Sequence, residues 1–404
     1  MRVLVQKFGG TSLSTPEARE HAIGHIRDAL EQGFKLVVVV SAMGRKGESY
    51  ATDTLLDWIR ANGNQLPVRE KDMLLACGEI ISATTVCSLL NERGIASIAL
   101  TGAQAGILTN AQYGNAQILS IDPVRITEQL AEDKVVIVAG FQGSTEDGDF
   151  TTLGRGGSDT SATALGAALK AEMVDIFTDV NGILTADPRV VEDAKPLDVV
   201  SYAEICNMAY NGAKVIHPRA VEIAMQAQVP IRVRSTFSKD EGTLVTSQDI
   251  LKHSEKIQDR FVTGIAHVSN VTQIQVKSQG NHRDLQLNVF KAMAEHQISV
   301  DFINVNPLGV VYTVFDYDAE QAIRVLRGMD YEPAYLENCA KVSVIGGGMN
   351  GVPGIMARIV EALTHEDIQI LQSADSNTTI WVLVTNSDMV KAIRALHTKF
   401  NLHK

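Results

Sequence analysis

The sequence predicts an α/β protein of two or three domains, in which an α/β sandwich precedes two small α+β modules. Three observations support this class. Up to about residue 235, short β-branched runs alternate with amphipathic helical stretches, which is typical of an α/β sandwich. The C-terminal part repeats itself at an offset of 70 residues. The 404 residues are too many for one ordinary core, and 45% of them are hydrophobic.

The elements of the N-terminal part follow from apolar runs and their flanking residues. Ser14, Pro16 and Glu17 indicate the start of a helix, and a long helical stretch over residues 68–94 ends at Gly94. Most predicted strands end in loops rich in Gly, Ser or Thr, at the edge where open α/β sheets place ligands. The strands are expected at residues 2–8, 35–42, 96–100, 134–140 and 174–179.

The repeat defines the predicted architecture of the C-terminal part. Residues 248–260 are polar and are expected to form a linker. Beyond them, Ile323 and Arg324 recur as Ile393 and Arg394, and the apolar positions of the two copies coincide. Each copy has the pattern strand, helix, strand, strand, helix, which predicts two α+β modules of the same kind.

Composition and charge disfavour several classes of protein. The formal net charge of −11 argues against nucleic acid and anionic membranes as partners, because such a surface repels phosphate groups. The longest apolar run, residues 36–40, is too short to span a bilayer, and the first residues have the pattern of a strand. We therefore expect a cytoplasmic protein. The four cysteines form no CxxC pair and are expected to be reduced thiols: Cys77, Cys87, Cys206 and Cys339.

Two glycine-rich loops suggest an anion site. In QKFGGTS, Lys7 ends the first strand, and Gly9 and Gly10 let backbone N–H groups approach an anion closely. Taken alone, this loop is explained equally well by a turn beside a surface lysine. In GRGGSD, Ser158 is expected to cap a helix whose positive end faces the same place as the QKFGGTS loop. The simpler alternative is a capped helix that packs through its alanines.

Two further loops carry polar and cationic residues. FTDVNGILTADPR supplies Thr178, Asp179 and Arg189, and NGAKVIHPR places Lys214 ahead of a helix. By itself, each of these cations would more often be a solvated side chain. Together the four loops predict a polyphosphate site, because cations offset the charge on a transferred phosphoryl group.

Other nucleotide-binding fingerprints are absent or do not fit. The sequence contains no GxxxxGK[ST], and it lacks the HRD and DFG motifs of protein kinases. GGGMNG at residues 346–351 matches GxGxxG, but too few residues follow it to build a dinucleotide-binding domain. We interpret it as a turn in a regulatory module.

In their order, the motifs VQKFGGTS, CGE, GFQG, TLGRGGSD, TDVNGILTADPR and GAKVIHPRAVEIA resemble those of the aspartate kinases (aspartokinases). The resemblance covers essentially the whole chain. Stretches such as VVVVSAMGRKG and SADSNTTIWVLV are most similar to the Bacillus-type, diaminopimelate-sensitive members of the family. The resemblance implies an amino-acid-kinase fold, a three-layer α/β/α sandwich, followed by two ACT domains. The implied parts are a catalytic domain at 1–245, a linker at 246–262 and ACT domains at 263–335 and 336–404.

The resemblance also implies roles for individual residues. Lys7 and Lys214 would offset charge on the moving phosphoryl group, and Asp159 would orient these lysines. Arg155 would pair with the α-carboxylate of aspartate, and Glu79 would meet its α-ammonium group. Without the resemblance, Glu79 would be interpreted as a mid-helix glutamate facing solvent. The ATP site would comprise Lys7, Gly9, Gly10, Ser41, Thr178, Asp179, Arg189 and Lys214. The aspartate pocket would be completed by Ser41, Thr52, Phe141 and Ser158.

The implied reaction transfers a phosphoryl group from ATP to the β-carboxylate of L-aspartate. The product, 4-phospho-L-aspartate, opens the lysine/diaminopimelate, threonine and methionine pathway. A carboxylate nucleophile is ionised at pH 7, so the site needs no general base. Mg²⁺ is expected with ATP, held mainly by phosphate oxygens and water, and no protein metal ligand is expected. An amino-acid effector at the ACT domains and a homo-oligomer formed through them are expected as well.

Two positions depart from the family pattern. Leu184 stands where many relatives have an aromatic residue, which leaves the stacking partner of adenine open. The first ACT module has SQGNHRD in place of a D-x-P-G loop, whereas the second keeps GVPG. An altered lysine or threonine pocket is compatible with diaminopimelate, a longer ligand with two zwitterionic ends. The candidate effector contacts are Val352, Ile370, Ser373, Asp375 and Asn377.

Two alternative functions stay open. Another kinase of the same fold, acting on acetylglutamate, glutamate or a nucleoside monophosphate, is disfavoured by the paired C-terminal modules. A catalytically inactive amino-acid sensor is disfavoured by the cations in all four loops.

Overall fold

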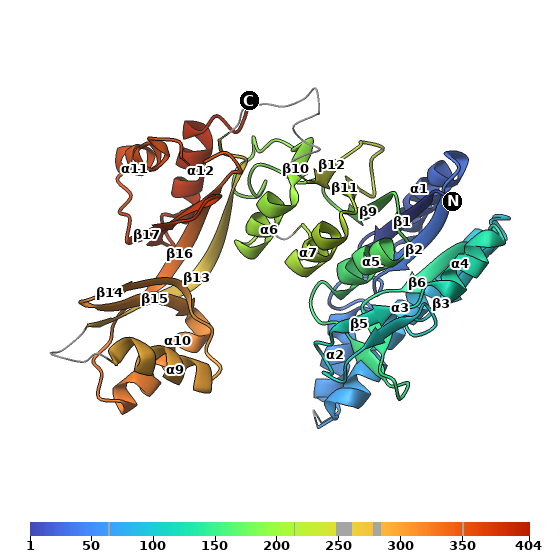
Figure 1. Cartoon of the computed structure of the whole chain (residues 1–404), viewed down its shortest axis with the longest axis horizontal. Coiled ribbons are helices and arrows are strands. Elements are labelled where there is room, and N and C mark those ends of the chain that lie inside the picture. The colour runs from blue at the N-terminus through green and yellow to red at the C-terminus, as the bar shows by residue number, and fades with distance from the viewer. Residues whose placement is uncertain (64, 214, 248–260, 278–283, 350) are drawn as a thin grey trace. The chain divides into compact units, whose positions relative to one another are not determined.

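The computed structural model describes the chain except for residues 64, 214, 248–260, 278–283 and 350. The chain packs into two compact units (Figure 1). The N-terminal unit comprises Met1–Ile183, Pro196–Ala209 and Lys214–Ile257, and the C-terminal unit comprises Leu184–Lys195, Tyr210–Ala213 and Gln258–Lys404. The predicted linker segment 248–260, the SQGNHRD loop up to residue 283 and Lys214 lie outside the described residues. The predicted domain boundaries stay a prediction.

An eight-stranded sheet forms the middle layer of the N-terminal unit. Its order is β10-β12-β11-β9-β1-β2-β6-β3, and every pair is parallel except β11 with β12. The five strands expected from the sequence are confirmed. The strands are β1 (Val3–Phe8), β2 (Lys35–Val40), β3 (Ser97–Leu100), β6 (Val135–Ala139), β9 (Met173–Thr178), β10 (Val199–Ser201), β11 (Ile231–Ser235) and β12 (Thr243–Thr246).

Helices cover both faces of this sheet, which confirms the predicted three-layer sandwich. Side chains of α1 and α3 share one core with the central strands, while α5 covers the opposite face and α7 packs against α5. The helices of this unit are α1 (Pro16–Glu31), α2 (Thr52–Ala61), α3 (Val68–Glu92), α4 (Val124–Ala131), α5 (Gly157–Ala168), α6 (Tyr202–Tyr210) and α7 (Pro218–Ala227).

The ends of two helices follow from local chemistry. Thr15 caps α1, since its side chain accepts a hydrogen bond from the Ala18 N–H at 3.1 Å. Gly94, with φ of 76°, ends α3 as predicted. Among the described helices, only α3 is long and apolar enough to cross a membrane. Its Val86 and Leu90 lie buried in the core of the N-terminal unit, which identifies α3 as a core helix.

A small second sheet attaches to α3 and carries the loops around the site. Its order is β5-β4-β7-β8. The buried Asp72 of α3 accepts hydrogen bonds from the Thr152 N–H at 2.7 Å, the Thr152 hydroxyl at 2.8 Å and the Gly114 N–H at 2.8 Å. One carboxylate therefore fixes this sheet to α3. The strands are β4 (Ile107–Thr109), β5 (Ile118–Ile121), β7 (Gln142–Ser144) and β8 (Phe150–Thr152).

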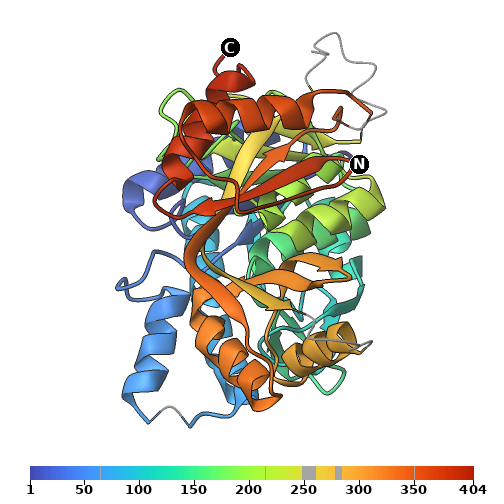
Figure 2. The ribbon, with the colours of Figure 1, turned by 90° about the vertical axis from the view of Figure 1, so that its left-hand side faces the viewer.

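The C-terminal unit contains one antiparallel six-stranded sheet in the order β14-β15-β13-β16-β18-β17. The helix pairs of its two modules lie at different ends of this sheet (Figure 2). Matching elements lie 70 residues apart, as for Leu285–Glu295 and Ile355–His365, which confirms the predicted repeat. The elements are β13 (Gly264–Lys277), α9 (Leu285–Glu295), β14 (Asp301–Asn306), β15 (Gly309–Phe315), α10 (Asp316–Gly328), β16 (Ala334–Ile345), α11 (Ile355–His365), β17 (Gln372–Asp375), β18 (Thr379–Thr385) and α12 (Met389–Lys399).

Each module of the C-terminal unit has its own hydrophobic core. The core of the second module also takes in residues from far earlier in the chain. Ala186 and Val191 of Leu184–Lys195 are buried there beside residues of β16, α11 and α12. We call Leu184–Lys195 the inserted segment.

Candidate active site

The predicted site lies at the carboxyl ends of four neighbouring strands. β9, β1, β2 and β6 are adjacent and parallel, so their carboxyl ends meet at one edge of the sheet. Lys7 lies near the end of β1, Ser41 follows β2, Phe141 follows β6 and Thr178 ends β9. Open α/β sheets bind their ligands at this edge.

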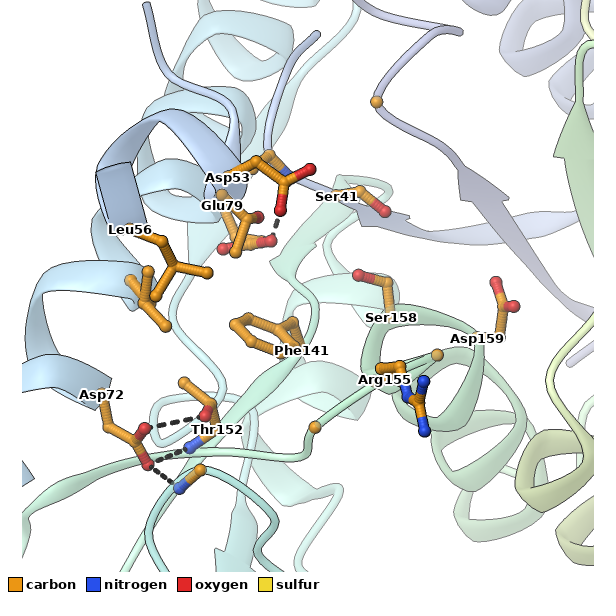
Figure 3. Close-up of a pocket in the computed structure, with 18 of the residues that line it drawn as sticks. Ser41, Asp53, Leu56, Asp72, Glu79, Phe141, Thr152, Arg155, Ser158 and Asp159 are labelled. Atoms are coloured by element: carbon orange, nitrogen blue, oxygen red, sulfur yellow. Dashed lines mark hydrogen bonds between the residues drawn. The ribbon is translucent and has the colours of Figure 1, made fainter. Parts of the chain in front are cut away.

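A cavity of about 530 Å³ opens here. Figure 3 shows side chains from α2, α3, β8, α5 and the loop after β2 facing it. The volume falls within the range usual for small-molecule sites. Nine of the predicted site residues line the cavity: Lys7, Gly10, Ser41, Thr52, Glu79, Phe141, Arg155, Ser158 and Asp159.

A buried ion pair joins the two glycine-rich loops. The Lys7 ammonium lies 2.6 Å from the Asp159 carboxylate, and the two side chains are only 13% and 12% exposed. Asp159 sits in the first turn of α5, which begins at Gly157. The prediction that Ser158 caps this helix is wrong, because Gly156, with φ of 67°, is the N-cap residue. Glycine adopts this left-handed conformation without strain, and it starts the helix before Ser158.

The glycines after β1 let backbone segments approach closely. A Cβ on Gly10 would lie 2.6 Å from the carbonyl oxygen of Ala42, so any side chain would push the two loops apart. A Cβ on Gly9 would lie 3.6 Å from the Lys7 ammonium, although Gly9 itself is not part of the cavity lining. The first loop is therefore packed directly against the residues that follow β2.

Glu79 is a buried carboxylate in the middle of α3. Its Oε1 accepts a hydrogen bond from the Ala42 N–H at 3.0 Å, and its Oε2 has no partner among the described residues. Burial raises the pKa of Glu79 to about 8. The alternative of a solvent-facing glutamate is wrong, because Gly78 lets α3 pack closely against Ala42.

Arg155 presents an exposed cation to the same cavity. It stands between Gly154 and Gly156, which both have positive φ. Figure 3 shows Arg155 in the turn that leads to Ser158 and Asp159. The cavity thus combines an exposed guanidinium with a buried carboxylate.

The remaining nucleotide-site residues lie outside the cavity lining. Thr178 donates a hydrogen bond to Asp179 at 3.2 Å, and Asp179 pairs with Arg45 at 2.6 Å. Arg189 belongs to the inserted segment and pairs with Asp187 at 2.6 Å, with its side chain 81% exposed. Lys214 lies outside the described residues.

The predicted effector residues lie in the second module of the C-terminal unit. Val352 and Ile370 pack against its core. Ser373 and Asp375 lie on β17, an edge strand, and Asn377 follows it, with all three exposed.

Several cavity residues have no counterpart in the sequence predictions. Lys71 and Asp72 of α3 and Asp53 of α2 line the cavity beside Glu79. Asp72, Leu75 and Glu79 are spaced three and four residues apart, which places them on one face of a helix. That periodicity is the signal that would have found them.

The comparisons with known proteins agree with this geometry. Residues 2–235 match the amino acid kinase family, and residues 335–398 match an ACT domain. Aspartokinase 1 of Bacillus subtilis is 57% identical over 404 residues, which cover 100% of both chains. The structure of Escherichia coli aspartokinase III in complex with aspartate and ADP has a TM-score of 0.80 at 26% identity and covers 98% of this chain and 99% of that one. The same enzyme in complex with lysine and aspartate has a TM-score of 0.75 at 27% identity, with coverages of 98% and 99%.

Fold and site therefore define an amino acid kinase with a C-terminal ACT region. At the identity found over the full length, the chain belongs to the aspartokinase family. The predicted enzyme class is confirmed: the protein is an aspartate kinase, an ATP-binding phosphotransferase of amino-acid biosynthesis with allosteric ACT domains.

Proposed function

We propose that the cavity binds L-aspartate beside the terminal phosphate of ATP. Glu79 and Arg155 bind the aspartate, and Lys7 contacts the transferred phosphoryl group. One observation carries this proposal. A buried carboxylate with a free oxygen, an exposed guanidinium and a half-buried lysine all face one cavity, and they belong to Glu79, Arg155 and Lys7. An anion and a cation at fixed positions recognise an amino-acid zwitterion.

The aspartate contacts follow from charge. Arg155 binds the α-carboxylate, for which a planar guanidinium offers two parallel N–H donors. Glu79 binds the α-ammonium group through its unpaired Oε2, and this contact favours the ionised carboxylate. Ser41, Thr52, Phe141 and Ser158 line the rest of the pocket.

Phosphoryl transfer needs positioning and charge compensation more than proton transfer. The β-carboxylate of aspartate attacks the γ-phosphorus while the bond to the β,γ-bridging oxygen of ATP breaks, so ADP leaves with the electron pair. Lys7, held by Asp159, offsets charge on the moving group. We assign Lys214 the same role. We assign Gly9, Gly10, Ser41, Thr178, Asp179 and Arg189 to nucleotide binding as well.

An ATP-dependent kinase uses a divalent metal ion, and we propose Mg²⁺. Two carboxylates of the cavity, Asp159 and Asp72, fit a metal held mainly by phosphate oxygens and water. Asp159 is engaged by Lys7, and Asp72 is saturated by backbone and hydroxyl donors, so neither is free to act as a ligand. When bound, Mg²⁺ supplies positive charge between the phosphates.

We also propose the finer biological setting. The product feeds the lysine/diaminopimelate, threonine and methionine pathway in the cytoplasm, and diaminopimelate is the feedback effector. Full-length similarity to a Bacillus aspartokinase supports this setting. The exposed polar residues Ser373, Asp375 and Asn377 would contact the effector, and the edge strands β14 and β17 would pair with a second copy.

A coupled assay for ADP release tests the proposal. The wild-type chain should turn over L-aspartate and not acetylglutamate or glutamate. Lys7→Ala should abolish turnover with the fold intact, and Arg155→Ala should mainly raise the KM for aspartate. Lys239→Ala, which changes an exposed lysine paired with Asp28, is the control. Wild-type activity in Lys7→Ala, or an unchanged aspartate KM in Arg155→Ala, would refute the assigned roles.

The effector is tested separately by titrating activity against lysine, threonine and meso-diaminopimelate, singly and in pairs. Inhibition by meso-diaminopimelate alone, weakened in Asp375→Asn, is the expected result. Inhibition by lysine or threonine alone would contradict the proposed effector.

A further inference from the structure

A second cluster of reactive side chains lies in the C-terminal unit. Asp193 comes from the inserted segment, His397 from α12 and His403 from the turn after α12. One potential ligand atom of each residue lies within 4.8 Å of the other two. The proposed aspartate kinase reaction uses none of these three residues.

His397 is buried and oriented from both sides of its ring. It is 1% exposed, and its Nε2 lies 3.0 Å from the hydroxyl oxygen of Thr185. Its Nδ1 lies 3.8 Å from a carboxylate oxygen of Asp193. Burial lowers the pKa of His397, so the ring is neutral at pH 7 and keeps a lone pair on one nitrogen. When one ring nitrogen of a histidine binds a metal, the other usually donates its N–H to an oxygen, and Thr185 supplies that oxygen here.

His403 contributes an unsatisfied nitrogen. Its Nδ1 is buried and has no hydrogen-bond partner among the described residues. A buried polar atom without a partner costs about 1–3 kcal/mol. A cation shared with His397 and Asp193 would remove this cost, because it accepts the lone pairs of both rings and neutralises the carboxylate.

We propose that Asp193, His397 and His403 form a Zn²⁺ site that fastens the inserted segment to the end of α12. Two imidazoles and a carboxylate are a usual three-residue ligand set for Zn²⁺, with water as the fourth ligand. Zn²⁺ bonds of about 2.0–2.2 Å need the ligand atoms to close in by roughly 1 Å. Asp193, with its side chain 64% exposed, and the half-buried His403 have room to do so. Mg²⁺ prefers oxygen ligands and is excluded by the imidazoles.

Equilibrium dialysis of the full-length chain against Zn²⁺ tests the site after metal has been removed with a chelator. The wild-type protein should bind one tightly held Zn²⁺ per chain that is missing from His403→Gln and from Asp193→Asn. Loss of a residue that only hydrogen-bonds to a metal ligand weakens metal binding by about 10–100-fold. Loss of a ligand itself should cost more, so each variant should bind this ion more than about 100-fold more weakly. Both substitutions lie at incompletely buried positions, so folding should survive. The control is His365→Gln, which changes an exposed histidine of α11.

A second measurement separates this site from adventitious binding at the cysteines. Zn²⁺ X-ray absorption of the wild-type complex should show nitrogen and oxygen neighbours and no sulfur. Zn²⁺ should raise the thermal midpoint of the wild type and of His365→Gln but not of His403→Gln, while Mg²⁺ should leave all midpoints unchanged. Equal Zn²⁺ affinity in the wild type and His403→Gln, or sulfur in the coordination shell, would overturn the proposal.

Discussion

Replacement of Glu79 by glutamine offers the sharpest test of how burial shapes the active site. Glu79→Gln keeps the size of the side chain and an acceptor for the Ala42 N–H, but it removes the ionisable group. Burial raises the pKa of Glu79 from its ordinary 4.5 to about 8. In the folded protein the carboxyl group is therefore mostly neutral at pH 7, whereas in the unfolded chain it is ionised.

The magnitude follows from this difference in pKa. Each unit of pKa difference is worth about 1.4 kcal/mol, so the shift destabilises the folded state by about 5 kcal/mol above pH 8. At pH 7 the cost is about 3 kcal/mol, and below pH 4.5 it vanishes because the group is neutral in both states. The free energy of unfolding is therefore highest in acid, where Glu79 is neutral in both states, and it falls as pH rises from 4.5 towards the folded pKa of about 8. Glu79→Gln escapes this loss.

Urea denaturation at several pH values checks the reasoning. The variant should match the wild type near pH 4.5 and should be more stable by several kcal/mol at pH 8. Isothermal titration with aspartate gives an independent measurement, because the proposed contact with the α-ammonium group requires the ionised carboxylate. The wild-type dissociation constant should fall about tenfold between pH 6 and pH 7, while binding to the variant should be weaker and independent of pH. Equal pH profiles for both proteins would refute the burial of a neutral Glu79.

Three further substitutions test contacts that position the site. Asp175→Asn leaves Arg232 without its buried partner at 2.8 Å and should lower the free energy of unfolding by about 3–5 kcal/mol in urea denaturation; a loss below about 1 kcal/mol would contradict a buried pair. Asp72→Asn should cost about 1–3 kcal/mol in the same assay and speed proteolysis of the small sheet, so unchanged cleavage would count against its anchoring role. Gly10→Ala should lower kcat/KM about 100-fold with an unchanged circular dichroism spectrum, because the new Cβ would lie 2.6 Å from the Ala42 carbonyl oxygen; normal kinetics would disprove that constraint.

Much of the fold was predictable because it depends on local patterns. The buried parallel strands are continuous apolar runs, such as residues 36–40, and this pattern is typical of strands that are covered on both faces. The repeat was visible because Ile323 and Ile393 occupy equivalent positions in α10 and α12. Helix starts were less predictable. Ser158 has a side chain suited to an N-cap, but the helix already begins at Gly157, with Gly156 in the left-handed conformation as its N-cap.

The cavity lining was predictable from its residues where loops carry it, whereas on α3 the family resemblance alone indicated Glu79, and Lys71 and Asp72 were missed. Glycines mark these loops, and at Gly10, Gly154 and Gly156 neighbouring atoms lie too close for a Cβ to fit. By contrast, Asp72 and Glu79 resemble solvated helix residues when each is considered alone. Both are buried, because Gly78 lets α3 approach Ala42 and because Asp72 contacts a small sheet assembled from distant segments. The charge of a residue is local information, but its exposure is decided by packing.

The inserted segment shows the same limit on a larger scale. Its motif ADPR, with Asp187 and Arg189, has the appearance of a nucleotide loop, and it follows β9 closely in the chain. Yet Ala186 and Val191 are buried among residues of β16, α11 and α12, which come more than a hundred positions later. A pattern within these twelve residues could not predict that they pack into the core of the second module. The motif therefore predicts the chemistry of this segment, whereas long-range packing decides where the segment is buried.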